Sequence, residues 1–312
     1  MREAGAYCVS MTFNPNADIS SGNVSRAGGG GGGMGRGGIA VGGGGGCLLV
    51  VVALIVALMG GDPMAILGGQ MGTTQDQSQV QPMDQQCTTG ADANANDDCL
   101  VQATVESADS VWGALAPEAG IPFAEPQAVI FSGQVNTGCG MASAAVGPFY
   151  CPADHGIYID TSFYQELTTR FGADGGNLAK EYVIAHEYGH HIQNLEGRMD
   201  RIDHSQTGPG SDSVRLELQA DCYAGVWANH ATSSTDSQGQ PFLQPLTSDD
   251  INSALSAATA VGDDHIQGEV AGGQVNPETW THGSSEARRA WFTQGYGSGD
   301  PKSCNTFEAA QV

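Results

Sequence analysis

The segment 185–191 holds residues whose types and spacing suit metal chemistry. His186 and His190 lie four residues apart and Glu187 follows the first histidine, so the segment contains the pattern H-E-x-x-H. On a helix both imidazoles project from one face toward a single ion, whereas His191 lies about 100° around the helix and is not expected to be a ligand. Zinc held by two neutral imidazoles keeps a position open for water and lowers the pKa of that water, and an adjacent carboxylate can take the proton. The pattern therefore predicts zinc-dependent hydrolysis, against the alternative that these side chains are solvated on a surface helix by chance.

A second segment supplies carboxylates for the same ion. Residues 211–228 begin with N-cap residues and continue into an apolar run, which predicts a helix with Glu217 and Asp221 one turn apart. The apolar neighbours indicate that this helix is largely buried, and buried carboxylates need a partner. One of the two can complete the zinc shell, and the other can accept the far N–H of a ligating histidine. Helical spacing alone does not decide which carboxylate takes which role.

Several blocks of the chain resemble the bacterial neutral zinc metallopeptidase family. The blocks comprise residues 138–151, 180–196, 217–227 and 281–307, and residues 11–20 are similar to the start of the family. The resemblance implies an α+β, zincin-like fold in which a small sheet lies above the H-E-x-x-H helix. It also implies zinc as the cofactor, a peptide or protein as the substrate, a membrane anchor, and Glu217 as the third ligand beside His186 and His190. In that assignment Glu187 is the general base and Asp221 hydrogen-bonds a ligating histidine.

A hydrolase of this kind needs a donor for the oxyanion of the tetrahedral intermediate. His282 is the first choice because it lies in a segment that resembles the family, although a structural or capping role is an equal alternative. The other candidates are Tyr188, Tyr223, His155, His204, His230 and His265. Gly189 lowers helix propensity inside the zinc-binding segment, which predicts a close backbone approach near the site.

The first hundred residues are poorly suited to a hydrophobic core. Glycine dominates residues 28–46, which we expect to be disordered, and residues 47–59 are continuously apolar. Residues 37–61 contain no charge and are long enough to cross a bilayer, which favours a transmembrane helix over a cleaved signal peptide or a buried core helix. Arginines precede this segment and the next basic residue is Arg170, so the positive-inside rule predicts a cytoplasmic N-terminus.

These features divide the chain into four parts. Residues 1–36 form a cytoplasmic Gly-rich disordered segment, 37–61 a transmembrane helix, 62–99 a stalk, and 100–312 an extracytoplasmic zinc metallopeptidase domain. The expected protein is anchored in the cell membrane by a single span.

Hydrophobic periodicity predicts the elements of the last part. Helices are expected at 101–115, 162–171, 247–262 and 285–294, and short strands at 128–131 and 156–160. Arg288 and Arg289 in the last helix are expected to form structural ion pairs. The resemblance further implies that an edge strand of the sheet binds the peptide by strand addition, and the sequence does not identify that strand.

Charge and cysteine content narrow the function further. The net charge of −23 at pH 7 disfavours nucleic acid and anionic lipid headgroups as partners, and it suits either saline surroundings or cationic peptide substrates. The spacing of the cysteines beyond the apolar run favours the local pairs Cys87–Cys99 and Cys139–Cys151, which leaves Cys222–Cys304. The alternative of a cysteine zinc site lacks any C-x-x-C spacing.

Two functions follow from these features. The first is a membrane-anchored zinc endopeptidase that hydrolyses peptide bonds by Glu187-assisted attack of a zinc-bound water. The alternative is a zincin-like binding or scaffolding module at the membrane that keeps the metal without turnover. The intact Glu187 favours the first, because a site without turnover has no need of a general base.

Overall fold

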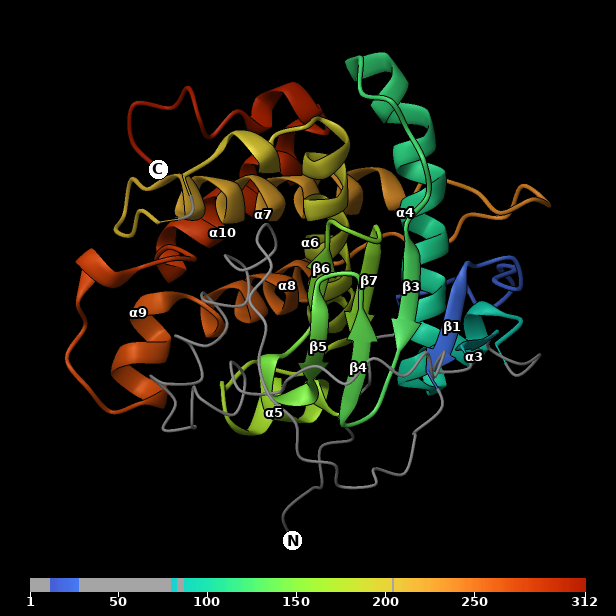
Figure 1. Ribbon diagram of the computed structural model, residues 1–312. Coiled ribbons are helices and arrows are strands. Elements are labelled where there is room, and N and C mark those ends of the chain that lie inside the picture. The colour runs from blue at the N-terminus through green and yellow to red at the C-terminus, as the bar shows by residue number, and fades with distance from the viewer. Residues whose placement is uncertain (1–11, 28–79, 83–86, 204) are drawn as a thin grey trace, which may run out of the picture.

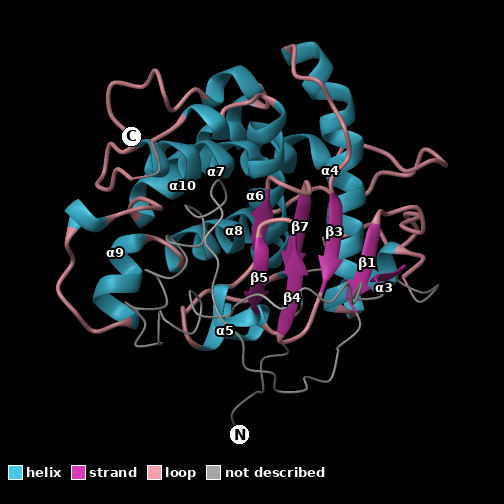
Figure 2. Cartoon of the chain, in the orientation of Figure 1, coloured by secondary structure: helices cyan, strands magenta, loops and turns pink. Residues whose placement is uncertain are grey.

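The computed structural model describes residues 12–27, 80–82, 87–203 and 205–312 (Figure 1). These residues form a mixed α/β structure in which a small sheet lies beside a larger group of helices (Figure 2).

The main sheet has five strands in the order β2-β1-β3-β7-β6. The central strands β1, β3 and β7 are parallel, whereas the outer strands β2 and β6 run antiparallel to their neighbours. A separate antiparallel hairpin consists of β4 and β5. The bounds are β1 Val24–Ala27, β2 Val80–Pro82, β3 Gln127–Ile130, β4 Gln134–Thr137, β5 Gly140–Ser143, β6 Phe149–Cys151 and β7 Gly156–Ile159.

Helices make up most of the remaining described residues. The α-helices are α3 Gly90–Ala95, α4 Asp97–Ala119, α5 Phe163–Thr169, α6 Asn177–Leu195, α7 Asp212–Ala231, α8 Ser248–Ala260, α9 Asp263–His265 and α10 Ser285–Ser298. A π-helix follows α9 at Ile266–Val270. Short 3₁₀ helices lie at Ala144–Val146, Met199–Arg201, Pro277–Thr279 and Pro301–Cys304.

The ends of the predicted helices follow from capping chemistry. The side chain of Ser211 accepts the backbone N–H of Val214 at the start of α7. Helix α4 ends at Gly120, whose φ of 81° is in the left-handed region that glycine adopts without strain. These helices and strands β3 and β7 confirm the elements predicted within residues 100–312, although α4 begins four residues earlier than the predicted helix and several short strands were missed.

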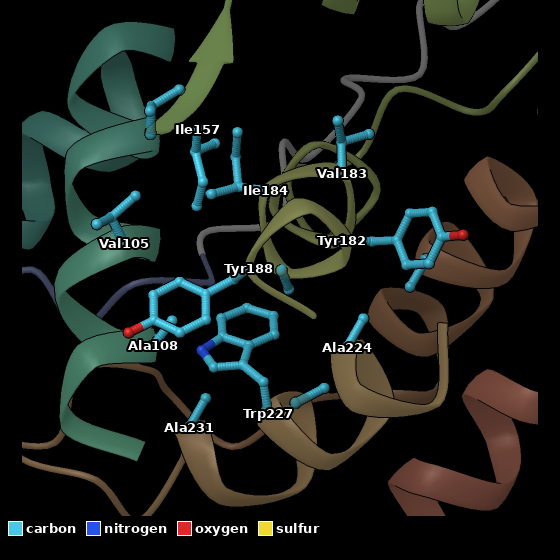
Figure 3. Close-up of a cluster of buried hydrophobic side chains, with 14 of the residues drawn as sticks. Val105, Ala108, Ile157, Tyr182, Val183, Ile184, Tyr188, Ala224, Trp227 and Ala231 are labelled. Atoms are coloured by element: carbon cyan, nitrogen blue, oxygen red, sulfur yellow. The ribbon is translucent and has the colours of Figure 1, made fainter. Parts of the chain in front are cut away.

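The core lies between the sheet and the helices α4, α6 and α7 (Figure 3). Ile157 of β7, Ile184 and Tyr188 of α6, and Trp227 of α7 all belong to this core (Figure 3). The indole N–H of Trp227 donates to Ser107 Oγ at 3.2 Å, so this buried polar group is satisfied. The core thereby fixes α6 against α7 and the sheet.

Residues 12–27 belong to the same core. Phe13, Ala17 and Ile19 are fully buried, and the amide of Gln102 on α4 donates to the carbonyl oxygens of Ile19 and Cys87. Residues 87–99 are packed in the same way, with the two cysteines at their ends buried. The folded domain therefore extends beyond the predicted boundary at residue 100 and includes part of the segment expected to be disordered.

The structure goes against the predicted transmembrane helix and the single-pass membrane localisation. No helix among the described residues is long and apolar enough to cross a bilayer. The segment 37–61 itself lies outside the described residues. In addition, β1 pairs with β3, and one crossing between them would put two hydrogen-bonded strands on opposite sides of a bilayer. The fold class, the membrane partner and the localisation are corrected accordingly: the anchor, the cytoplasmic N-terminus and the stalk that depended on it are not retained.

The predicted disulfide pairing is confirmed. Cys87–Cys99, Cys139–Cys151 and Cys222–Cys304 are all bonded. The first joins the residues before α3 to α4, and the second links β6 to the turn between β4 and β5. The third spans 82 residues and ties α7 to the 3₁₀ helix at Pro301–Cys304.

Candidate metal centre

Helices α6 and α7 bring His186, His190 and Glu217 together. One ligand atom from each lies within 4.8 Å of the others. The Nε2 atom of His186 is 3.2 Å from Glu217 Oε2, and the Nε2 atom of His190 is 3.5 Å from Glu217 Oε1. A Cβ atom on Gly189 would lie 2.9 Å from the carbonyl oxygen of Ala220, so the missing side chain allows α6 to approach α7 at this point. This is the close backbone approach predicted for Gly189.

The donor set fits a zinc ion. Two imidazole nitrogens and one carboxylate are ligands that zinc accepts, and three protein ligands leave a fourth position for water or substrate. The Nδ1 atoms of both histidines contact side-chain oxygens on the side away from Glu217, so both Nε2 atoms turn toward the carboxylate. The two histidines are thus held in the orientation that a shared ion requires.

The far nitrogen of His186 contacts a buried charged cluster. His186 Nδ1 lies 2.8 Å from Asp221 Oδ1, and Asp221 also receives two hydrogen bonds from the guanidinium of Arg288, at 2.8 and 2.9 Å. The hydroxyl of Tyr182 donates to the same carboxylate. Arg288 therefore forms the predicted structural ion pair, whereas Arg289 is exposed.

Charge in this cluster shifts the pKa values of its members. Burial alone would raise the pKa of Asp221, but the nearby charges of Arg288 and His186 outweigh burial and lower it. Burial alone would lower the pKa of His186, but Asp221 outweighs burial and, with Glu217, raises it to about 9. The cluster therefore keeps Asp221 ionised beside the imidazole.

The far nitrogen of His190 contacts neutral groups. His190 Nδ1 lies 2.9 Å from Gln193 Oε1, and the amide nitrogen of Gln193 donates to Leu216 O at 2.7 Å and to Gln219 Oε1 at 3.1 Å. Gln193 was not among the predicted site residues. The available signal is its position three residues after His190, which puts both side chains on one face of the helix.

Glu187 lies in the wall of the same cavity as the three candidate ligands. It is buried, and burial raises the pKa of its carboxyl group above the usual value despite the nearby histidines. The cavity measures about 170 Å³. Its lining is mainly apolar and includes Phe149, Phe163, Phe171, Val183, Val261 and Ile266.

His282 also lines this cavity. One carboxylate oxygen of Asp263 accepts the backbone N–H groups of residues 281, 282 and 283, which fixes the loop that carries the imidazole. Among the described residues, the side-chain contacts of His282 are made through Nδ1, to Thr281 Oγ1 at 3.0 Å and Asp263 Oδ1 at 3.3 Å. Burial alone would lower the pKa of His282, but Glu217 and Asp263 outweigh burial and raise it.

The other candidate donors are engaged elsewhere. The hydroxyls of Tyr188 and Tyr223 donate to Asp109 and Glu196, and the Nε2 atoms of His230 and His265 contact backbone carbonyls. His155 lies edge-on against His191, which itself contacts the Tyr150 hydroxyl and the Ala124 carbonyl. His204 lies outside the described residues. Of the candidates that the structure describes, His282 alone lines the cavity.

The chain is similar to known proteins over most of its length. The family model described as "Putative neutral zinc metallopeptidase" matches residues 15–307. An uncharacterized protein of Mycobacterium tuberculosis is 52% identical over 256 residues, which cover 82% of this chain and 86% of the relative. The uncharacterized protein YpfJ of Escherichia coli is 40% identical over 234 residues, which cover 73% of this chain and 78% of the relative.

No solved structure matches the chain. Zinc is the metal of the matched family, and the group His186, His190 and Glu217 could bind it. Because the family model covers nearly the whole chain, the protein belongs to the neutral zinc metallopeptidase family.

Proposed function

We propose that this protein is an endopeptidase that hydrolyses peptide bonds with a zinc ion held by His186, His190 and Glu217. One observation supports the proposal above the others: two imidazole Nε2 atoms and a carboxylate converge on one point of a cavity that Glu187 also lines. Family membership implies a peptide or protein as the substrate.

Glu187 is proposed as the general base. Bound zinc would polarise the scissile carbonyl and lower the pKa of a water molecule. Because Glu187 follows His186 directly on α6, its carboxylate can reach a water at the open position of the site, accept a proton and return it to the leaving amine. A binding module without turnover would not need this carboxylate, which disfavours the scaffolding alternative.

His282 is proposed as the donor to the oxyanion. Its imidazole lines the cavity and its loop is fixed by three backbone N–H groups that donate to Asp263. Because Asp263 Oδ1 can only accept, Nδ1 carries a proton, and the raised pKa of His282 favours a second proton on Nε2. In that protonated form Nε2 can donate to an oxygen that develops negative charge. Such a donor acts through its fixed position, so Asp263 contributes by holding the loop.

The outer strand β6 is proposed to bind the peptide backbone. Phe149 and Tyr150 of β6 line the cavity, and within the described part of the chain β7 is the partner of β6. An extended peptide can pair with such an edge by main-chain hydrogen bonds. The apolar lining of the cavity would then receive a side chain of the substrate.

The ligand set is tested by comparing Glu217→Ala with Asp221→Asn. Loss of a ligand should leave the protein without zinc and inactive, whereas loss of the carboxylate that orients His186 should weaken zinc binding or activity by about 10- to 100-fold. Elemental analysis and hydrolysis of casein, an unfolded protein substrate, measure both effects. Wild-type hydrolysis should stop with a chelator and return with zinc. The reverse ranking of the two variants would exchange the roles of Glu217 and Asp221.

A further inference from the structure

The carbonyl oxygen of Cys304 lies at the end of a hydrogen-bonded chain that begins at His190. The amide nitrogen of Gln219 donates to Cys304 O at 3.0 Å, and the amide nitrogen of Gln193 donates to Gln219 Oε1 at 3.1 Å. Gln193 Oε1 then lies 2.9 Å from His190 Nδ1. All four residues are buried: His190 is 8% exposed, Gln219 1%, and the other two 0%.

A carbonyl oxygen can only accept hydrogen bonds, so the chain has one consistent direction. Cys304 O requires the nitrogen of Gln219 to face it, which turns Gln219 Oε1 toward Gln193. The nitrogen of Gln193 must then face Gln219, and the carbonyl of Leu216 imposes the same orientation. Gln193 Oε1 is left to face His190, so Nδ1 carries the proton and Nε2 keeps its lone pair for a metal.

The Cys222–Cys304 disulfide holds Cys304, the last residue of this hydrogen-bonded series, in place. Cys222 lies on α7 three residues after Gln219, on the same helical face, and its bond keeps Cys304 beside the helix. The C-terminal segment is also held by Thr306, whose hydroxyl donates to the Arg215 carbonyl at 2.6 Å. The C-terminal segment thus lies against the helix that carries Glu217.

We propose that Gln193 and Gln219, here called the amide pair, are positioning residues that fix the tautomer of His190, and that the Cys222–Cys304 disulfide sets the amide pair. The proposal rests on the proposed ligand set, but it concerns zinc affinity and the imidazole tautomer rather than turnover. It assigns the C-terminal segment a role in metal binding, although that segment does not line the cavity.

The test is the zinc affinity of Gln219→Met, measured by competition with a chelator on the full chain. Methionine keeps the length and packing of glutamine but cannot relay the orientation. Gln219 contacts neither the cavity nor a ligand, yet the proposal expects zinc binding several-fold weaker, and about 10- to 100-fold weaker for Gln193→Met. The double variant Cys222→Ala/Cys304→Ala should weaken zinc binding in the same direction.

The chain offers a matched control in Gln102→Met. Gln102 is also a buried glutamine whose amide donates to the carbonyl of a disulfide-bonded cysteine, Cys87, at 3.0 Å, but it lies outside the zinc site. The control variant should lose stability and keep wild-type zinc affinity. Wild-type affinity in Gln219→Met, or an equal loss in both variants, would overturn the proposal.

A measurement on the wild-type protein applies even if a variant fails to fold. The nitrogen chemical shifts of the His190 imidazole, read by NMR in zinc-free protein, distinguish a proton on Nδ1 from one on Nε2. The amide pair requires the proton on Nδ1 before zinc is added. A predominant Nε2–H tautomer would contradict the proposal whether or not the protein hydrolyses casein.

Discussion

The two histidines of the site are oriented by opposite kinds of chemistry. His186 contacts the ionised Asp221, which is paired with Arg288 in the interior, and Arg288 is only 3% exposed. His190 contacts the neutral amide of Gln193, whose direction is set by backbone carbonyls. A buried ion pair is strongly destabilising once one partner is removed, whereas a lost neutral hydrogen bond costs less. The contacts of His186 should therefore contribute more to the stability of the fold, whereas the contacts of His190 should affect mainly zinc binding.

The largest expected difference is in the stability of variants that remove the side chain contacting each histidine. Asp221→Ala leaves the buried guanidinium of Arg288 without its carboxylate and should lower the free energy of unfolding by about 3–5 kcal/mol. Gln193→Met removes neutral hydrogen bonds and should cost about 1–2 kcal/mol. Urea unfolding of the metal-free proteins measures both values without the contribution of zinc.

A second variant identifies the cause of the Asp221 effect. If the uncompensated charge is responsible, Asp221→Ala/Arg288→Met should recover part of the lost stability. If Asp221→Ala lowered the free energy of unfolding no more than Gln193→Met does, the proposed difference between the contacts of His186 and those of His190 would be wrong.

A smaller effect is expected at a buried carboxyl group that lacks the strong pairing of Asp221. Glu181 accepts a hydrogen bond from Thr12, and burial raises its pKa to about 8. Asp250 adds to this increase and Lys180 opposes it. Because the folded-state pKa is above the unfolded value, stability from this group is complete below about pH 4.5 and is lost as the pH rises through about 8.

Glu181→Gln should remove this loss of stability. The expected difference in unfolding free energy between pH 5 and pH 8 is a few kcal/mol at most in the wild type and smaller in the variant. Urea unfolding at the two pH values measures it, with Glu118→Gln as the control because Glu118 is exposed. Parallel pH profiles for wild type and Glu181→Gln would show that the carboxyl group of Glu181 does not cause the loss.

The surroundings of the two histidines differ in how far they could be predicted from the sequence. Glu217 and Asp221 were predicted as a pair because two carboxylates one helical turn apart are a strong local signal, and family resemblance alone assigned their separate roles. Gln193 was missed because its role depends on Leu216 and Gln219, which belong to another helix. His282 could be named only through family resemblance, since a loop fixed by Asp263 from 19 residues earlier has no local pattern.

Local patterns also misjudged the N-terminus. Residues 12–27 are followed directly by a glycine-dominated stretch. The composition of the N-terminal region favoured disorder and a membrane span. The structure instead pairs β1 with β3, about one hundred residues later in the chain, and buries Phe13 and Ile19. Pairing across such a separation leaves no periodic trace in either strand. The helices of the core, by contrast, follow from periodicity and caps within each segment.

Glu187 is proposed to transfer the proton at a zinc site formed by other residues. The most direct test of this role measures zinc content and casein hydrolysis together in Glu187→Gln. The glutamine occupies the same volume and cannot accept the proton, so the variant should retain zinc at the wild-type level and lose hydrolysis. Full casein hydrolysis by zinc-loaded Glu187→Gln would rule out proton transfer by Glu187.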